Sequence, residues 1–561
     1  MKLVLICVVM VLALTANAQR NGNIPAKSAM HHEVMEQPYV QDDLSKHPRS
    51  KAYTYKGVEF FTTQVNVDAN GMNIVGDAAN EPSIGIDPKN PDRMVIGWRQ
   101  FDNVNNSFRQ AGYGYSTNGG NSWTFPGVID PGIFRSDPVL DTDSAGTFYY
   151  NSLTKDELDN YTCQVFRSYD GGATWDGGTF ALGGDKQWMV IDKSGGMGDG
   201  HIYAFWTYYY SICNPKAFTR STDRGSFYED CYTLDGQPHW GTLAVSPDGE
   251  LYTVGANDLS VITVTKSSTA MDPLNPVSWD FTSEVFLDGE LSGWSDVNPA
   301  GLTGQANIAV DYSEVGKGNV YVLASVDRLS NSDPADVMFS RSTDGGLSWS
   351  APVRINDDVS TSNYQWFGTL SVAPNGRIDV VWLDTRANLF GFLSSALYYS
   401  YSLDQGLTWS ANVALSEPFD SRIGWPQQNK MGDYFHMVST NEAAHLAWCG
   451  TFNQEQDVYY GRISVETSGM AKNEENISEA YVYPNPFKEQ ATLKFNMKKT
   501  AEFTVLIQDV FGNKVSAQNW GMLTAGSQSL VLQTDGLKAG VYFCTLVSGN
   551  QKQTIRLMLM D

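Results

Sequence analysis

The chain has 561 residues, of which 12% are aromatic and 18% charged, and its formal net charge is −24. This length exceeds what one hydrophobic core usually supports, so more than one domain is expected. The acidic balance argues against nucleic acid as a partner, because binding phosphates requires a basic footprint. It indicates a well-solvated surface instead.

Residues 1–18 have the pattern of a cleaved secretory signal. Lys2 precedes an apolar run from Leu3 to Leu14, and Ala16-Asn17-Ala18 forms an A-x-A cleavage site. No later stretch is long and apolar enough to span a bilayer. Residues 19–52 are polar and aperiodic, and they are predicted to form a flexible leader.

The cysteines of an exported protein can form disulfides. Cys213 and Cys231 flank one predicted hairpin and form the best candidate pair, although pairings with Cys163 stay open. The scattered spacing contains no metal signature, so no metal or other cofactor is expected. Asp141-Thr142-Asp143 lacks a full set of calcium ligands and fits a turn better.

A unit of four short strands recurs between residues 53 and 466, and each unit begins with two apolar strands joined by a Gly/Asp/Pro/Asn turn. The first strands begin near Glu81, Asp137, Gln187, Trp240, Ala306, Phe367 and Tyr434. Radial repetition of four antiparallel strands makes a β-propeller, an all-β fold. Seven blades are predicted, with six as the alternative if the first or last unit is not a full blade. The last unit lacks an outer strand, which residues near Val58 to Val65 are expected to supply.

A shorter motif marks the turn between the third and fourth strands of most units. Ser342 to Trp349 reads S-T-D-G-G-L-S-W, and four related octapeptides start at Ser116, Ser168, Ser221 and Ser402. One unit has lost the motif, and Trp279 stands where its tryptophan would fall. The aspartate can accept turn N–H groups, glycine allows a positive φ, and the tryptophan can lie over the sheet. The shared pattern S-x-D-x-G-x-x-W resembles the Asp-box (BNR) repeat of sialidase-type β-propellers, and it is predicted to be structural.

Residues 467–479 are polar and contain glycine, as a linker does. From 480 to 561, alternating strands with Gly and Pro turns predict a small β-sandwich. Tyr483 to Phe487 (Y-P-N-P-F), Asp509 to Gly512, Gly536 to Tyr542 and a final strand at Gln553 to Met560 resemble the C-terminal sorting domain of the Bacteroidetes type IX secretion system. The extreme end departs from that pattern, since it lacks the usual lysine. The resemblance implies that the type IX machinery is a partner and that the protein is secreted or displayed at the outer-membrane surface.

The order of strands in a blade places the starts of first strands and the ends of second strands on one rim, opposite the motif turns. Carboxylates, arginines and aromatic rings gather on this rim, as a saccharide site requires. The sialidase resemblance implies a tyrosine nucleophile with a glutamate, an aspartate as acid/base, and arginines that clamp the sialic acid carboxylate. The catalytic candidates are Tyr434 as nucleophile, Glu81 as its base, and Asp137 or Asp185 as proton donor. The substrate-binding candidates are Arg99, Arg135, Arg328, Arg386, Trp188, Trp240 and Trp366.

Two features separate this chain from sialidases. The F/Y-R-I-P motif of the family is absent and is only echoed by Phe134-Arg135-Ser136-Asp137-Pro138, and a seventh blade would shift every catalytic position. Arg386 could simply pair with Asp384, and the tryptophans could pack between blades. The leading hypothesis is a secreted, exo-α-sialidase-like glycoside hydrolase acting on extracellular glycans or glycoproteins at the axial mouth. The alternatives are a non-catalytic cell-surface propeller that binds carbohydrate or protein, and a lyase or hydrolase for another polysaccharide.

Overall fold

The computed structural model describes residues 37–57, 59–291, 293–387, 393–464, 476–509, 514–534, 536–548 and 551–560. The expected signal at 1–18, residues 19–36 of the expected leader and residues 467–475 of the expected linker lie outside these ranges. Apart from the 3₁₀ turn η1 (Leu44–Lys46), every regular element described is a β-strand, which confirms the all-β prediction. Within the same ranges, no helix has the length and apolar character needed to cross a membrane.

The chain divides into two compact units, residues 1–465 and 466–561, which are described separately. In the first unit, seven antiparallel sheets within the described residues each begin with an inner strand. Blade 1 contains β5 (Ala78–Ile86), β6 (Met94–Phe101), β7 (Gln110–Ser116) and β8 (Thr124–Ile129). Blade 2 contains β9 (Ser136–Thr142), β10 (Phe148–Lys155), β11 (Tyr161–Ser168) and β12 (Thr179–Phe180). Blade 3 contains β13 (Trp188–Ile191), β14 (Ile202–Phe205) and β15 (Phe218–Ser221).

The remaining sheets follow the same plan. Blade 4 contains β16 (Leu243–Val245), β17 (Leu251–Ala256), β18 (Ile262–Ser267) and β19 (Phe281–Glu284). Blade 5 contains β21 (Asn307–Val310), β22 (Val320–Arg328), β23 (Asp336–Ser342) and β24 (Val353–Arg354), with β20 (Gly289–Leu291) added to β22. Blade 6 contains β25 (Gln365–Val372), β26 (Ile378–Asp384), β27 (Ser394–Ser402) and β28 (Val413–Ala414), with β29 (Phe419–Asp420) added to β27. The closing blade contains β30 (His436–Ser439), β31 (Ala444–Gly450), β32 (Asp457–Ile463), β3 (Phe60–Gln64) and β2 (Thr54–Lys56).

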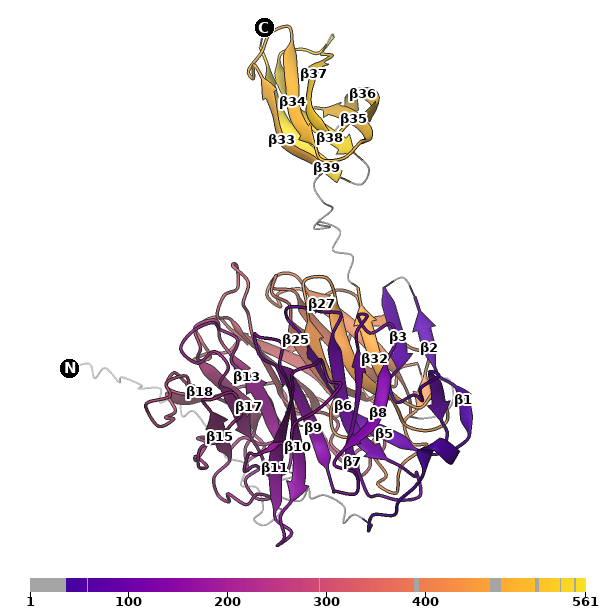
Figure 1. Ribbon diagram of the computed structural model, residues 1–561. Helices are drawn as coiled ribbons and strands as arrows, with labels where there is room; N and C mark the ends of the chain where they lie inside the picture. The colour runs from indigo at the N-terminus through magenta and orange to yellow at the C-terminus, as the bar shows by residue number, and fades with distance from the viewer. Residues whose placement is uncertain are drawn as a thin grey trace, which may run out of the picture. The chain divides into compact units, whose positions relative to one another are not determined.

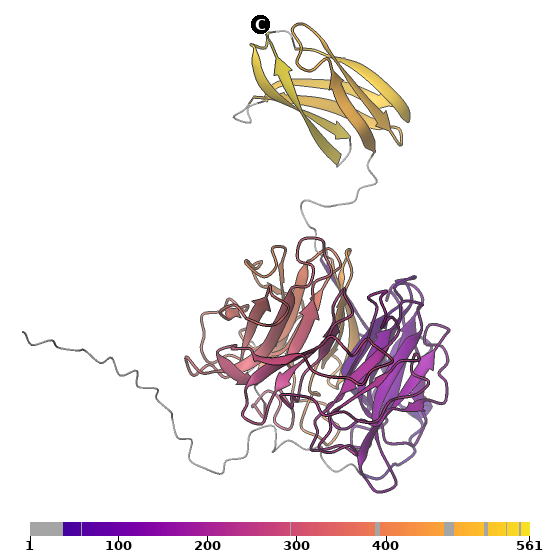
Figure 2. The ribbon, with the colours of Figure 1, turned by 90° about the vertical axis from the view of Figure 1, so that its left-hand side faces the viewer.

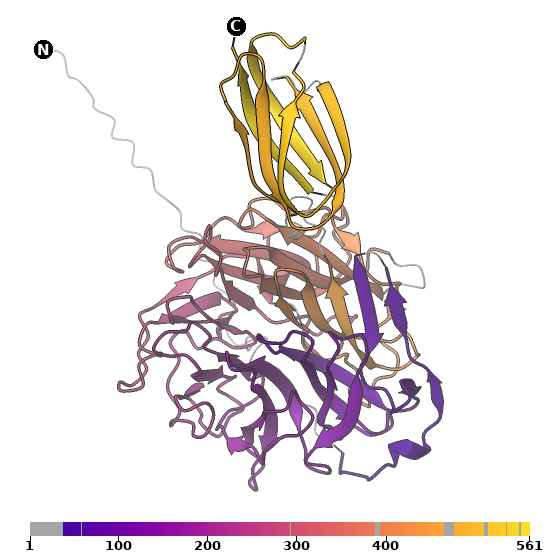
Figure 3. The same cartoon turned by 45° about the horizontal axis from the view of Figure 1, so that its top comes forward.

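The inner strands contact one another in a circle, in the order β5, β9, β13, β16, β21, β25, β30 and again β5. In Figure 3 the colour accordingly passes around the first unit from indigo through magenta to orange. The sheets therefore surround one axis, and the predicted β-propeller is confirmed.

The propeller is closed by its own N-terminal segment. Strand β3 pairs with β32, and Thr62 Oγ1 donates a hydrogen bond of 2.7 Å to the carbonyl of Tyr460; Figure 1 shows the indigo β3 beside the orange β32. This confirms that residues near Val58 to Val65 supply the missing strand. Part of the predicted flexible leader is also ordered, because β1 (Arg49–Lys51) pairs with β4 (Met72–Ile74). An ion pair of 3.0 Å between Arg49 and Asp68 adds to this pairing.

In five blades, a residue other than glycine lies in the left-handed region, either in the inner strand or just before it. These residues are Glu81, Asp137, Lys186, Trp240 and Phe367, with φ between 45° and 57°. The strand register shifts beside several of them, as it does at a β-bulge, which re-aims a side chain. Such a backbone conformation costs on the order of 1–3 kcal/mol per residue and is maintained by the surrounding structure. In blades 1 to 3 it brings three charged side chains, Glu81, Asp137 and Lys186, into one cluster described below.

The recurring S-x-D-x-G-x-x-W motif forms a turn in which side chains bond the backbone. Ser342 Oγ accepts from the N–H of Gly346 at 2.8 Å, and Asp344 Oδ1 accepts from the N–H of Ser348 at 2.9 Å. The same serine-to-glycine bond recurs in the four related turns that start at Ser116, Ser168, Ser221 and Ser402. Gly345 and Gly346 have φ of 72° and 91°, which a Cβ would disfavour. The motif is a structural turn, as predicted.

The motif tryptophans pack between blades. Trp409 of blade 6 meets Phe339 of blade 5 edge-on, with ring centroids 5.0 Å apart. Trp349 Nε1 of blade 5 donates to Ser283 Oγ of blade 4 at 3.0 Å. Trp279, in the unit without the motif, packs against Phe218 of blade 3 in the same way. Each tryptophan therefore joins its blade to the preceding one.

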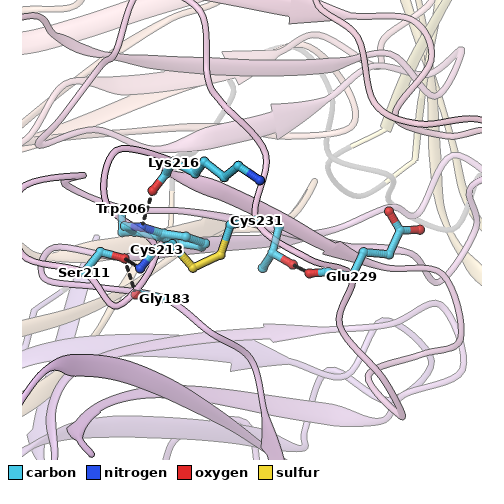
Figure 4. The surroundings of a disulfide bond; sticks show 8 residues. Gly183, Trp206, Ser211, Cys213, Lys216, Glu229 and Cys231 are labelled. Carbon is cyan, nitrogen blue, oxygen red and sulfur yellow. Dashed lines mark hydrogen bonds between the residues drawn. A yellow bond between two sulfur atoms is a disulfide. The ribbon is translucent and has the colours of Figure 1, made fainter. Parts of the chain in front are cut away.

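The predicted pair Cys213–Cys231 forms a disulfide, while Cys163, Cys449 and Cys544 are buried free thiols. Figure 4 shows that the disulfide ties the loop after β14 to the segment after β15, with Trp206 beside it. It thus closes the outer part of blade 3, the one propeller sheet with three described strands.

The second unit is a β-sandwich, as predicted (Figure 2). One sheet contains β33 (Ile477–Tyr483), β34 (Ala491–Met497) and β37 (Gly526–Leu532). The other contains β36 (Lys514–Leu523), β35 (Ala501–Gln508), β38 (Gly540–Ser548) and β39 (Gln551–Leu559). Leu493 and Phe495 of the first sheet pack in one buried cluster with Phe503 and Leu546 of the second.

Candidate functional site

Seven buried charged side chains gather where the inner strands of neighbouring blades begin. We call them the axial cluster: Glu81, Asp137, Asp185 and Asp433, with Arg99, Lys186 and Lys430. Lys186 Nζ lies 2.8 Å from Asp433, 3.1 Å from Asp137 and 3.5 Å from Asp185. One ammonium thus joins acids of three different blades.

The other half of the axial cluster surrounds Glu81. Arg99 Nε lies 3.1 Å from Glu81 Oε2, and Lys430 Nζ lies 3.5 Å from Glu81 Oε1. Lys430 also lies 2.8 Å from Asp433, which links the two halves. Burial raises the pKa of Glu81 well above its usual value; Arg99 opposes this rise and Asp137 adds to it.

Tyr434 lies against the axial cluster from the closing blade. Its hydroxyl donates a hydrogen bond of 2.8 Å to the carbonyl of Pro138. Burial raises the pKa of Tyr434 well above its usual value, and the charges of Glu81 and Asp137 raise it further. The structure therefore brings the catalytic candidates Tyr434, Glu81, Asp137 and Asp185 together with Arg99. All are at most 3% exposed, so the cluster is enclosed by protein.

The other three arginines of the predicted clamp each form an ion pair with an aspartate outside the axial cluster. Arg135 pairs with Asp130 at 2.8 Å and stacks on Phe166. The remaining pairs are Arg328 with Asp288 and Asp336, and Arg386 with Asp384 and Asp357. The bonds at Arg386 include the local pairing with Asp384 that its sequence suggested.

The three candidate tryptophans are buried in the packing of the blades. Trp188 meets Tyr434 edge-on, with ring centroids 5.1 Å apart. Trp240 meets Trp294 in the same way at 5.7 Å, and Trp366 Nε1 donates to Ser395 Oγ at 3.0 Å. They are between 0% and 5% exposed, which favours the packing role over sugar stacking.

An open pocket of about 460 Å³ lies on the same rim, at blade 4. Two segments line it, residues 233–237 before β16 and residues 257–259 in the turn between β17 and β18. Asp235, Gln237, Asn257 and Asp258 give it a polar wall. No sequence pattern predicted this pocket, although the order of strands in a blade places both segments on the rim where first strands begin and second strands end.

The wall of this pocket at Asp258 is backed by aromatic side chains. Tyr208 donates to Asp258 Oδ2 at 2.8 Å, and His239 Nε2 lies 3.2 Å from Asp258 Oδ1. The contact with His239, then Tyr209 and Tyr208, lowers the pKa of Asp258 to about 2 against the effect of burial. The rings of Tyr208 and Tyr209 lie 3.9 Å apart. Asp258 is therefore an ionised acceptor, fixed in position and 41% exposed. The run Tyr208-Tyr209-Tyr210 was the available signal in the sequence.

Comparison with known proteins gives results for both units. Residues 481–560 match the family model of the secretion system C-terminal sorting domain. A curated xyloglucanase from Paenibacillus sp is 23% identical over 513 residues, which cover 81% of this chain and 45% of the relative. The chain thus spans less than half the length of that relative.

Solved structures with a similar chain trace include two at the same TM-score. The phage phi92 endosialidase has a TM-score of 0.42 at 9% identity, covering 89% of this chain and 87% of that one. A protein of unknown function from Dyadobacter fermentans also has a TM-score of 0.42, at 12% identity, covering 73% of this chain and 99% of that one. The match to the family model assigns the second unit alone. The second unit contains a secretion-system sorting domain, which implies the type IX machinery as a partner and a secreted or cell-surface location.

Proposed function

We propose that the propeller is an extracellular glycan-acting hydrolase and that its substrate is a neutral polysaccharide. The xyloglucanase similarity supports the class of substrate, because that relative is named for its action on a polysaccharide and the match extends far beyond the sorting domain. Export by the sorting domain brings the propeller to where such polymers occur.

The observation that carries the proposal is the open pocket at Asp258. A saccharide site needs carboxylate and amide groups that bind the sugar hydroxyls. The pocket offers Asp258, Gln237 and Asn257, and Tyr208 holds Asp258 in position through a hydrogen bond of 2.8 Å. In contrast to the axial cluster, it is open to solvent.

The arginines favour a neutral ligand over an anionic one. A carboxylate-bearing sugar needs bidentate arginine donors. Arg135, Arg328 and Arg386 are each engaged with an aspartate of the protein, so recruiting them would break existing ion pairs.

The test combines binding and hydrolysis on the full chain. Affinity electrophoresis in gels containing xyloglucan or mixed-linkage glucan measures binding, and release of reducing ends measures hydrolysis. Asp258→Asn and Tyr209→Ala should each weaken binding at least tenfold. Asp248→Asn is the matched control, because Asp248 lies in the same blade, on the turn between β16 and β17, and is 74% exposed. Folded wild-type protein that neither binds nor cleaves any neutral polysaccharide would refute the proposal.

Hydrolysis of sialosides at the axial cluster is the second candidate. It is favoured by the proximity of the tyrosine, glutamate and aspartate candidates to one another and to Arg99 in the axial cluster. Here Tyr434 is the nucleophile, Glu81 its base, and Asp137 or Asp185 the proton donor. Turnover of a fluorogenic sialoside that disappears in Tyr434→Phe would support this candidate. Binding of glycan without cleavage of any substrate would instead identify a non-catalytic binding propeller.

A further inference from the structure

Three buried carboxylates meet where the closing blade joins blade 1. Asp77 directly precedes β5, while Glu455 and Asp457 lie at the turn from β31 into β32. Asp77 and Asp457 are 0% exposed and Glu455 is 6% exposed. One oxygen from each lies within 4.8 Å of the oxygens of the other two. We call these three residues the seam triad.

The charges of the seam triad are not balanced by a basic side chain in the described part of the chain. None of the ion pairs among those residues includes Asp77, Glu455 or Asp457. The fold therefore brings three buried carboxyl groups together at the seam without a basic partner among the described residues.

Uncharged hydrogen-bond donors contact most of the carboxylate oxygens of the seam triad, but one oxygen lacks a donor among the described residues. Glu455 accepts from the side chain of Asn73 and from the N–H of Gly76, both at 2.7 Å. Asp457 accepts from Asn66 at 2.9 Å and from Asn453 at 3.0 Å. These amides hold the seam triad in a fixed arrangement.

The open atom is Oδ1 of Asp77. Its other oxygen accepts from Gln100 at 3.1 Å, but Oδ1 is buried without a hydrogen-bond partner among the described residues. Asn66 lies beside Asp77 and directs its amide hydrogen to Asp457. A buried carboxylate oxygen without a donor costs free energy unless something else satisfies it.

We propose that the seam triad binds one calcium ion, which latches the closing blade to blade 1. Calcium prefers six to eight oxygen ligands at roughly 2.3–2.6 Å, so ligand atoms on opposite sides of the ion lie about 4.8 Å apart. The spacing of the triad fits that span. The surrounding amides can present their carbonyl oxygens by rotating, which adds neutral ligands. Magnesium demands a smaller octahedral shell and usually retains several waters, which suits this buried site less well.

The location gives the ion a specific role. Asp77 belongs to the start of blade 1 and Asp457 to the strand that pairs with β3, so one ion would bridge the two ends of the ring. This role is independent of the proposed glycan site, and it is tested without any activity measurement.

The experiment uses the full chain after treatment with EDTA and gel filtration. Calorimetric melting with 1 mM calcium chloride should raise the transition of the propeller by about 3 °C, the size expected when ligand is present well above its dissociation constant. Asp77→Asn and Asp457→Asn should each abolish this shift. Elemental analysis of untreated protein should find one calcium per chain.

The matched control is Asp333→Asn. Asp333 is also a buried carboxylate with one unpartnered oxygen, and burial raises its pKa to about 6, but its environment includes Arg354. This variant should retain the full calcium shift. Absence of a shift in the wild-type protein, or an equal shift in Asp77→Asn, would overturn the proposal. A shift of the same size with magnesium chloride would overturn the assignment to calcium.

Discussion

Replacing Lys186 with methionine removes the cation that joins three blades at the axis. Lys186 is fully buried and contacts Asp137, Asp185 and Asp433 at 3.5 Å or less. Methionine has a similar length and fills much of the same volume, so the change removes charge more than packing. The three carboxylates are then left with less compensation in a site that excludes water.

The expected loss in the free energy of unfolding is about 3–5 kcal/mol, the range for removing one partner of a buried ion pair. The loss should shrink as the pH falls. Without the ammonium, the pKa of a neighbouring carboxylate rises in the folded state, so the folded variant takes up a proton that the unfolded chain takes up only at lower pH.

Urea unfolding of the full chain, followed by tryptophan fluorescence at pH 7.5 and pH 5.5, measures both effects. Lys193→Met is the matched control, since Lys193 pairs with Asp141 at the surface and is 35% exposed. Loss of an exposed pair costs at most about 1 kcal/mol. The idea that Lys186 neutralises the carboxylates of the axial cluster is refuted by either of two results. One is that Lys186→Met lowers the free energy of unfolding by less than about 1 kcal/mol, and the other is that it lowers it equally at both pH values.

Three further predictions address other parts of the propeller. Asp344→Ala should lower the free energy of unfolding by about 1–3 kcal/mol, because the carboxylate bonds both the N–H and the hydroxyl of Ser348; an unchanged urea midpoint would contradict this. Burial lowers the pKa of His445 to about 4, so the folded protein takes up a proton at this ring only at lower pH than the unfolded chain does. The contribution of His445 to the free energy of unfolding should therefore be full above pH 6.5 and should fall by roughly 3 kcal/mol as the pH drops to 4. His445→Gln should flatten that part of the stability curve, and an identical curve would count against the assignment. Replacing Cys213 and Cys231 together with alanine should cost about 2–4 kcal/mol in calorimetry, as for other short disulfide loops, and an unaltered melting transition would show that the disulfide adds nothing.

Much of the fold follows from local signals in the sequence. Turn residues at regular spacing predicted the blades. The motif around Asp344 predicted a turn, and in the structure the Asp344 carboxylate accepts a hydrogen bond from the backbone of that turn. The order of apolar strands even predicted that the N-terminal segment completes the last sheet. Two features depended on contacts between distant residues. Trp409 packs on Phe339 of the preceding blade, and residues 49–51, which were expected in a flexible leader, pair with β4.

The candidate site was harder to predict, because assigning residues to a rim does not determine their exposure. The order of strands in a blade correctly predicted that Glu81, Asp137 and Tyr434 lie close together, but their side chains are buried inside the protein. The arginines were expected to converge on one ligand because they share a rim. Arg328 instead forms ion pairs with two aspartates of its own blade. Asp258 was missed because an aspartate in a short turn has no distinctive pattern; only its contacts with Tyr208 and His239 mark it.

Closure by β3 has a consequence for how the protein is made. Thr62 and its partner Tyr460 are 398 residues apart in sequence, so the ring cannot close until nearly the whole propeller has been synthesised. Contacts of such long range form slowly, because their loop-closure entropy must be overcome first. Until then β3 lacks the strand that it pairs with, and an open strand edge invites pairing with other chains. A nascent propeller that is still unclosed therefore depends on being kept apart from its copies, and a chain truncated before β32 should aggregate instead of forming a smaller ring.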